Sequence, residues 1–260
     1  HPGYQLRVQT LGGFRAWRGA AEIDPREWQR DKARQLFQLL LTQLGRPLQR
    51  EEIAERLWPN LTAEIANRDF KVALNALNKV LEPGRSADTA SAYISRDGTA
   101  YCLRAEADLW LDAAEFERAA EAGLNLIDGP EADAQEKALV LLQSAVNLYT
   151  GDFLPEAVFE EWAAHEQERL LALFLRAADR LAGLLLERGQ AQDAIVMCQR
   201  ILARDACWER AYQIMMLAHE HSGNRTQALR TYQRCVAALR TELDVSPSAA
   251  TLALYERLNG

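Results

Sequence analysis

A run of donor-rich side chains between residues 67 and 81 has the types and spacing needed to bind nucleic acid. The candidate contacts are Arg68, Lys71, Asn75, Asn78 and Lys79. At about 3.6 residues per turn they fall on one side of a helix, and apolar residues fall on the other. Arginine and lysine bind phosphate or guanine, and asparagine can pair in bidentate fashion with adenine in a major groove. Alone, the pattern also fits an ordinary solvated amphipathic helix, so the neighbouring segments decide its interpretation.

Recognised groupings for catalysis or metal binding are missing from the sequence. It contains no Gly-rich phosphate loop, no Gly-x-Ser-x-Gly and no His-Glu-x-x-His. His219 and His221 are two residues apart and would diverge by about 200° on a helix, which is a poor metal geometry. Acidic pairs at 51–52 and 160–161 fit solvated helix faces. We therefore expect a protein that is not an enzyme, with no cofactor and no metal.

The composition is that of a globular protein of about two domains. Of its 260 residues, 48% are hydrophobic and 26% charged, and no apolar run approaches the ~20 residues that would span a bilayer. The four cysteines form no Cys-x-x-Cys pair, which favours free thiols in a reducing cytoplasm. The chain starts at His1 rather than at Met, which favours a piece of a longer protein. We expect a cytoplasmic location and no membrane contact.

Charge is distributed unevenly along the chain. Residues 1–104 carry 16 Lys and Arg against 12 Asp and Glu, a net +4, whereas residues 105–260 carry 14 against 25, a net −11. A mildly basic front joined to an acidic back fits a nucleic-acid module attached to a module that contacts proteins. We place the domain boundary between residues 104 and 105.

The front segment predicts a small sheet followed by helices and a hairpin. Alternating apolar residues predict short strands within 6–23, and apolar spacing predicts helices over 28–44, 50–57 and 67–81 with a polar connection over 60–66. Asp97-Gly98 between two β-prone runs predicts a hairpin over 92–103. This order is that of a winged helix-turn-helix, an α+β fold, in which 67–81 is the recognition helix. Arg96 then lies near the wing tip, and Arg50, near the start of a helix, is placed to meet phosphate.

The back segment predicts an all-α repeat domain. Expected helices cover 113–127, 131–149, 159–188, 191–203, 207–221, 225–242 and 248–258. Gly189 matches Gly223 and Ala194 matches Ala228 at an offset of 34 residues, which is the tetratricopeptide period. A glycine would end the first helix of each hairpin, and the small alanine would let the second helix pack closely.

Several motifs resemble those of the Streptomyces antibiotic regulatory protein family. In the front half these are Leu-Gly-Gly-Phe (11–14), Leu-Trp-Pro (57–59), the helix over 70–81 and Arg-Asp-Gly (96–98). In the back half, Tyr-Thr-Gly-Asp-Phe-Leu-Pro (149–155) and Leu-Asp-Val-Ser-Pro-Ser (243–248) resemble the bacterial transcriptional activator domain of the same family. The resemblance implies a winged helix-turn-helix followed by a tetratricopeptide-like domain. It also places the connection over 60–66 where related modules touch RNA polymerase.

The predicted recognition helix departs from the family pattern at one point. The family usually has Ser-Arg-Leu-Arg where this chain has Asn-Ala-Leu-Asn (75–78), so two arginines are missing.

Three functions fit the sequence. The first is a DNA-binding transcriptional activator that places the helix over 67–81 in the major groove of double-stranded DNA, as a homodimer or in tandem. Its acidic helical-repeat half would serve for dimerisation, polymerase contacts or regulatory contacts. The second is a protein-interaction or sensor module whose winged helix no longer binds DNA. The third is the output end of a longer, ATP-switched regulator.

Overall fold

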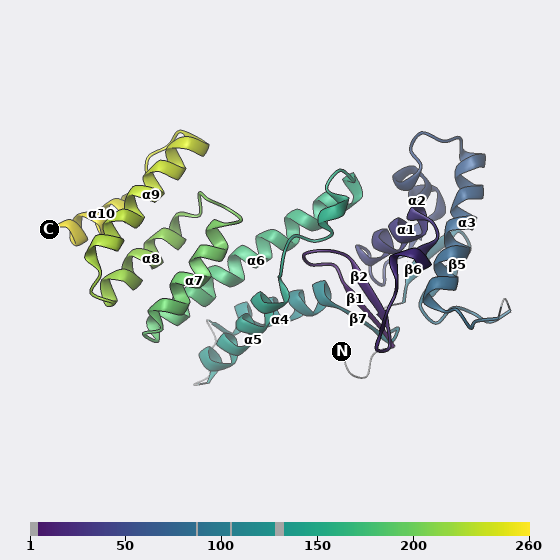
Figure 1. Ribbon diagram of the computed structural model, residues 1–260, viewed down its shortest axis with the longest axis horizontal. Coiled ribbons are helices and arrows are strands. Elements are labelled where there is room, and N and C mark those ends of the chain that lie inside the picture. Colours follow the sequence, from purple (N-terminus) through teal and green to yellow (C-terminus); the bar gives the residue numbers. More distant parts are fainter. Residues whose placement is uncertain (1–4, 87, 105, 128–132) are drawn as a thin grey trace. The chain divides into compact units, whose positions relative to one another are not determined.

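The computed structural model describes residues 5–86, 88–104, 106–127 and 133–260 (Figure 1). The chain divides into two compact units, the first formed by residues 1–115 and 148–171 and the second by 116–147 and 172–260. The first unit thus includes segments that follow residue 104. The functional boundary between residues 104 and 105 stays a prediction.

The first unit opens with a four-stranded sheet in the order β3-β2-β1-β7. Its strands are β1 (Leu6–Gln9), β2 (Arg15–Arg18), β3 (Ala21–Glu22) and β7 (Leu109–Leu111). The antiparallel pairing of β1 with β2 confirms the predicted strands and puts Val8 opposite Ala16. The parallel pairing of β7 with β1 was not predicted, because three residues are too few to show an alternating pattern.

The helices of the first unit confirm the predicted order and correct three boundaries. They are α1 (Asp31–Leu41), α2 (Arg50–Leu57) and α3 (Ala63–Leu81), and the 3-10 helix η1 (Pro25–Trp28) precedes α1. The predicted helix over 28–44 is wrong at its start, because Gln29 has a φ of 54° and interrupts the helical path after Trp28. It is also wrong at its end, because α1 stops at Leu41 and residues 42–45 form a turn. The third helix begins at Ala63 rather than at residue 67, so part of the predicted connection is helical.

The predicted hairpin is present and forms a second sheet, in the order β4-β6-β5. Its strands are β4 (Leu48–Gln49), β5 (Ile94–Asp97) and β6 (Ala100–Leu103). Gly98 takes a φ of 58° in the turn between β5 and β6, a conformation that glycine adopts without strain. Phe70 of α3 packs edge-on against Tyr101 of β6 with ring centroids 4.9 Å apart. The sheet, three helices and hairpin are the layout of a winged helix.

An extended segment after α5 forms backbone hydrogen bonds with the turn that follows β1, which lies in the same unit. Phe153 forms an antiparallel bridge with Leu11, and the amide of Leu154 donates to the carbonyl of Thr10 at 2.8 Å. Asp112 is buried beside it and accepts hydrogen bonds from the Thr10 amide and hydroxyl, both at 2.8 Å. Two motifs far apart in the sequence, 11–14 and 149–155, therefore share one structural junction.

The remaining helices follow the predicted ranges to within a few residues. They are α4 (Asp112–Ile127), α5 (Ala134–Leu148), α6 (Glu161–Glu187), α7 (Ala191–Leu202), α8 (Glu209–His221), α9 (Arg225–Leu243) and α10 (Ala249–Asn259), and the 3-10 helix η2 (Pro155–Ala157) precedes α6. Gly189 and Gly223 follow α6 and α8 with φ of 74° and 69°, as expected of glycines that end helices. The fully buried Ala194 and Ala228 confirm the predicted close packing. The tetratricopeptide classification of these hairpins stays a prediction.

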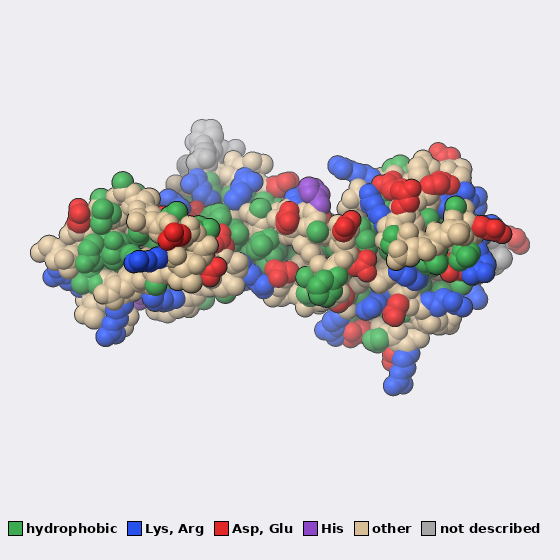
Figure 2. All heavy atoms as spheres, turned by 90° about the horizontal axis from the view of Figure 1, so that it is seen from above, with side chains coloured by type: hydrophobic (Ala, Val, Ile, Leu, Met, Phe, Trp, Pro, Cys, Tyr) green, Lys and Arg blue, Asp and Glu red, His purple; other side chains and the backbone are tan. Residues whose placement is uncertain are grey.

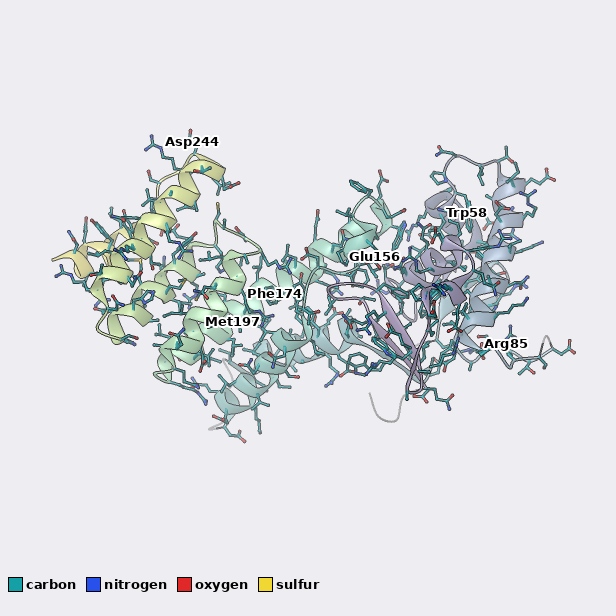
Figure 3. The ribbon with its side chains drawn as sticks, viewed as in Figure 1. Trp58, Arg85, Glu156, Phe174, Met197 and Asp244 are labelled. Carbon is teal, nitrogen blue, oxygen red and sulfur yellow. The ribbon has the colours of Figure 1, made fainter. Side chains whose placement is uncertain are left out.

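The core of the second unit lies between its helices. Phe174 of α6 and Met197 of α7 are both buried, and Figure 3 shows them on neighbouring helices. Asp179 is also buried: it accepts a hydrogen bond from the indole of Trp208 at 3.0 Å and pairs with Arg210 at 3.0 Å. The buried carboxylate is tolerated here because it accepts a hydrogen bond from the neutral Trp208 indole and pairs with the charged Arg210 guanidinium. In the described part of the chain, no helix combines the length and apolar character needed to cross a membrane.

Candidate nucleic-acid interface

Helix α3 has one buried face and one exposed face, as the spacing predicted. The buried side chains are Ala66, Phe70, Ala73, Leu77, Val80 and Leu81. Four of the predicted contacts, Arg68, Lys71, Asn75 and Lys79, are exposed. Burial of six apolar residues fixes the rotation of the helix about its axis, so these four side chains point away from the core.

The C-terminal end of α3 is held by an arginine from the first sheet. Arg18 of β2 donates from Nη1 to the carbonyl of Val80 at 2.5 Å, and from Nη2 to Glu27 at 2.5 Å. A cation at the C-terminus of a helix is favoured by the helix dipole. The hydrogen bond from Arg18 holds the pKa of Glu27 below its usual value. The sheet thereby positions the helix that carries the candidate contacts.

Arg68 is exposed but already has an internal partner. Its Nε lies 3.0 Å from Oδ1 of Asp69, and the side chains are 71% and 34% exposed. An ion pair with this exposure is worth roughly 0–1 kcal/mol, so it would yield readily to a phosphate.

The two asparagines of the recognition helix lie in different surroundings. Asn75 is exposed, whereas Asn78 is half-buried. Oδ1 of Asn78 is enclosed and has no hydrogen-bond partner among the described residues. Asn75 is therefore the asparagine that is free to meet a base edge, and Asn78 lies at the border of the exposed face. The role of both stays a prediction.

Arg96 and Arg50 both lie near the turn of the wing, Arg96 on β5 and Arg50 directly after β4, so that β6 runs between them. The Arg96 Nε donates to the carbonyl of Gly98 at 3.0 Å, and its guanidinium lies 5.7 Å from the centre of the Tyr101 ring. The amide of Arg50 donates to the carbonyl of Thr99 at 2.9 Å, which ties the start of α2 to the wing turn. The Arg50 side chain is 26% exposed and pairs with Glu51 at 2.9 Å. Each arginine is thus positioned at the wing turn by its own contact, on its own side of β6.

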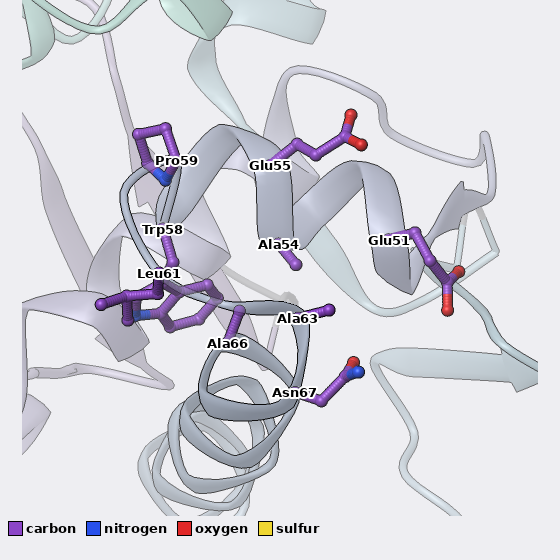
Figure 4. A pocket seen from close by; sticks show the side chains of 9 residues that line it. All are labelled: Glu51, Ala54, Glu55, Trp58, Pro59, Leu61, Ala63, Ala66 and Asn67. Carbon is purple, nitrogen blue, oxygen red and sulfur yellow. The ribbon is translucent and has the colours of Figure 1, made fainter.

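A pocket of about 400 Å³ opens at the connection between α2 and α3 (Figure 4). Trp58, Pro59 and Leu61 line it from the connection, with Ala63 and Ala66 from α3. Glu51 and Glu55 of α2 also line it, so an apolar floor meets two carboxylates. This arrangement suits a partner segment that combines apolar and basic side chains.

Exposed apolar residues on α3 and just before it were not predicted from the sequence. Leu61, Ile65 and Val72 are 41%, 37% and 38% exposed. Ile65 and Val72 fall outside the buried stripe that includes Phe70 and Leu77, so the helical period of the sequence could have indicated that they are exposed.

On the face drawn in Figure 2, basic and acidic side chains are interspersed rather than gathered into a surface of one sign.

Comparison with known proteins identifies the class of protein. Residues 111–259, more than half of the chain, match the bacterial transcriptional activator domain. The chain belongs to this family, in the form found in Streptomyces antibiotic regulatory proteins.

The individual relatives are regulators. The chain is 28% identical over 256 residues to the regulatory protein AfsR of Streptomyces coelicolor, covering 97% of this chain and 24% of AfsR. It is 25% identical over 223 residues to the transcriptional regulator RedD of the same organism, covering 84% of this chain and 61% of RedD. The chain thus spans about a quarter of AfsR.

A solved structure shares the fold over nearly the whole chain. Mycobacterium tuberculosis EmbR, solved in complex with a low-affinity phosphopeptide, superposes with a TM-score of 0.81 at 19% identity. The match covers 98% of this chain and 65% of EmbR. It supports the winged-helix and helical architecture described above.

Proposed function

We propose that this chain is a DNA-binding transcriptional regulator, acting as an activator in the cytoplasm, that places α3 in the major groove. The observation that carries the proposal is the exposed face of α3, where Arg68, Lys71, Asn75 and Lys79 lie opposite a fully apolar buried face. The 19 residues of α3 span about 28 Å, and the major groove is wide enough to admit a helix.

The exposed side chains divide into two roles. Arg68, Lys71 and Lys79 contact phosphates and set the register of the helix, while Asn75 reads a base edge. Arg96 and Arg50 contact the backbone beside the wing. A winged helix of this size reads few base pairs, so we expect a homodimer or tandem binding on double-stranded DNA.

The pocket between α2 and α3 is proposed to contact RNA polymerase. Its apolar floor and its carboxylates, Glu51 and Glu55, complement a helix that carries both apolar and basic side chains. The pocket lies at the connection preceding α3, so a protein docked there need not compete with DNA for the exposed face of that helix.

A second candidate function has one observation in its favour. Leu61, Ile65 and Val72 are large apolar residues exposed on or beside α3, as in a helix that docks onto a protein. In this alternative the winged helix is a protein-interaction module that does not bind DNA.

The deciding experiment is a salt titration of the whole chain on a pool of random duplex DNA, followed by sequencing of the retained fraction. A steep decrease of affinity with salt and an enriched repeated half-site would support the proposal, because phosphate contacts release counterions. Absence of retention at low salt would contradict it and favour the protein-interaction module.

A further inference from the structure

Val72 is an apolar side chain set among the proposed DNA contacts. It is 38% exposed and lies on α3 four residues after Arg68 and three residues before Asn75. Residues at these spacings are neighbours on a helix surface. A valine in the interior of a polar, solvent-facing patch exposes apolar surface to water, and contact with an apolar group of a ligand would remove that cost.

The surroundings of Val72 narrow the chemistry of the ligand. Val72 and Trp58 line a hollow of about 260 Å³ that Arg30 and Lys32 also line, and the Lys32 ammonium lies 5.8 Å from the Trp58 ring centre. An apolar wall beside two cations fits a ligand with an apolar group close to a negative charge.

The carboxylates of this hollow are both ion-paired. Asp69 pairs with Arg68 at 3.0 Å, and Asp31 pairs with Arg34 at 3.6 Å. Arg30 and Lys32 on the lining match these two carboxylates in number, and Arg34 and Arg68 lie beside the hollow whether or not Arg68 turns to a phosphate. An anionic ligand is therefore compatible with it.

We propose that Val72 is a specificity residue that contacts the C5-methyl group of a thymine in the major groove, next to the base read by Asn75. Thymine is the one base with an apolar group on its major-groove edge, and the phosphates of the same strand supply the negative charge. This inference rests on the proposed function of α3. It assigns to Val72 a preference for thymine over cytosine and over uracil.

The test uses the site selected from the random pool. Each thymine of that site is replaced singly by deoxyuridine, which keeps the base pair and removes only the methyl group. We expect one replacement to weaken binding of the unmodified protein about four-fold, the value of one buried methyl group. The Val72→Ala variant should bind the thymine site more weakly and should discriminate less between thymine and uracil at that position.

Two controls separate the role of Val72 from the effect of any valine-to-alanine change and from a loss of folding. Val196→Ala on α7 makes the same change at a valine that is 47% exposed, and it should keep full discrimination. Folding of Val72→Ala is checked by circular dichroism, and alanine is the better helix former.

The outcomes distinguish the inference from the function on which it rests. Binding of the selected site with no effect of any uracil replacement would overturn the role of Val72 and leave the proposed function intact. Full discrimination by Val72→Ala would overturn it equally. Failure of the unmodified protein to bind any DNA would overturn both.

Discussion

A β-carbon at Gly12 would lie only 2.8 Å from Oγ1 of Thr150. The same hydroxyl donates to the carbonyl of Leu11 at 2.6 Å, and the Gly12 amide donates to the carbonyl of Asp152 at 2.9 Å. Gly12 also has a φ of 83°, a conformation that favours glycine. At Gly12, the turn between β1 and β2 thus packs so closely against the segment over 149–155 that a side chain has no room.

Gly12→Ala should destabilise the protein more than a change at a glycine that has space. The variant faces both the positive φ and the contact with Thr150, so we expect a loss of about 2–3 kcal/mol in the free energy of unfolding. The matched control is Gly19→Ala, where φ is 57° and nothing lies within 4 Å. Denaturant unfolding measures both, and equal losses would contradict the role assigned to Thr150.

Asp179 should matter for the stability of the second unit because it is the buried acceptor for two donors. Asp179→Ala leaves the Trp208 indole without that acceptor and Arg210 without its ion pair, at a cost of about 2 kcal/mol. Asp193→Ala on α7 removes an exposed carboxylate and should change stability little. Thermal unfolding of both variants is the measurement, and similar melting temperatures would contradict the importance of the buried carboxylate.

The four cysteines should react in two classes. Burial raises the pKa of Cys198 and of Cys235 to about 12, and desolvation also raises the pKa of Cys207, but Cys102 and Cys207 are only half-buried and so remain accessible to a reagent. The thiolate is the reactive form, so at pH 8 Cys198 and Cys235 should react with a thiol reagent only after unfolding. Mass spectrometry of the labelled protein assigns each site. Rapid labelling of Cys198 in the folded protein would contradict the burial of this thiol.

Asn75→Ala should change sequence preference more than overall affinity. A bidentate contact to adenine contributes discrimination rather than counterion release, so preference at one base pair should decrease by roughly ten-fold or more. Asn78→Ala provides the comparison, because that side chain is half-buried and its Oδ1 is enclosed. Selection from random DNA with each variant gives the preference directly. Uniform weakening on all sequences by Asn75→Ala would count against base reading there.

Sequence patterns predicted the elements better than their ends. Helix α2 was bounded correctly because Pro59 follows it closely. The start of α3 was placed late because Ile65, the one large apolar residue of its first turn, lies outside the buried stripe, and the Thr62 side chain forms no capping hydrogen bond. Strand β7 was missed because its pairing with β1 depends on a partner about a hundred residues away.

The sequence predicted which residues make up the candidate site, but it predicted less well how exposed each of them is. The helical period placed Arg68, Lys71 and Lys79 on one face, but it did not show that neighbours half-cover Asn78. Val72 was not assigned a role, because a single apolar residue on a polar helix face is unremarkable until its exposure is known. Burial depends on what packs around a helix, and a single helical period does not contain that information.

The central claim is that the exposed face of α3 binds the phosphates of DNA, and the salt dependence of binding tests it most directly. For the Arg68→Ala, Lys71→Ala double variant we predict weaker binding and a salt slope reduced by about two, one for each lost cation. The charge-matched control is Arg230→Ala, Arg234→Ala on α9, where both arginines are exposed and the slope should not change. A slope unchanged by the α3 variant would remove this face of the helix from the DNA contact.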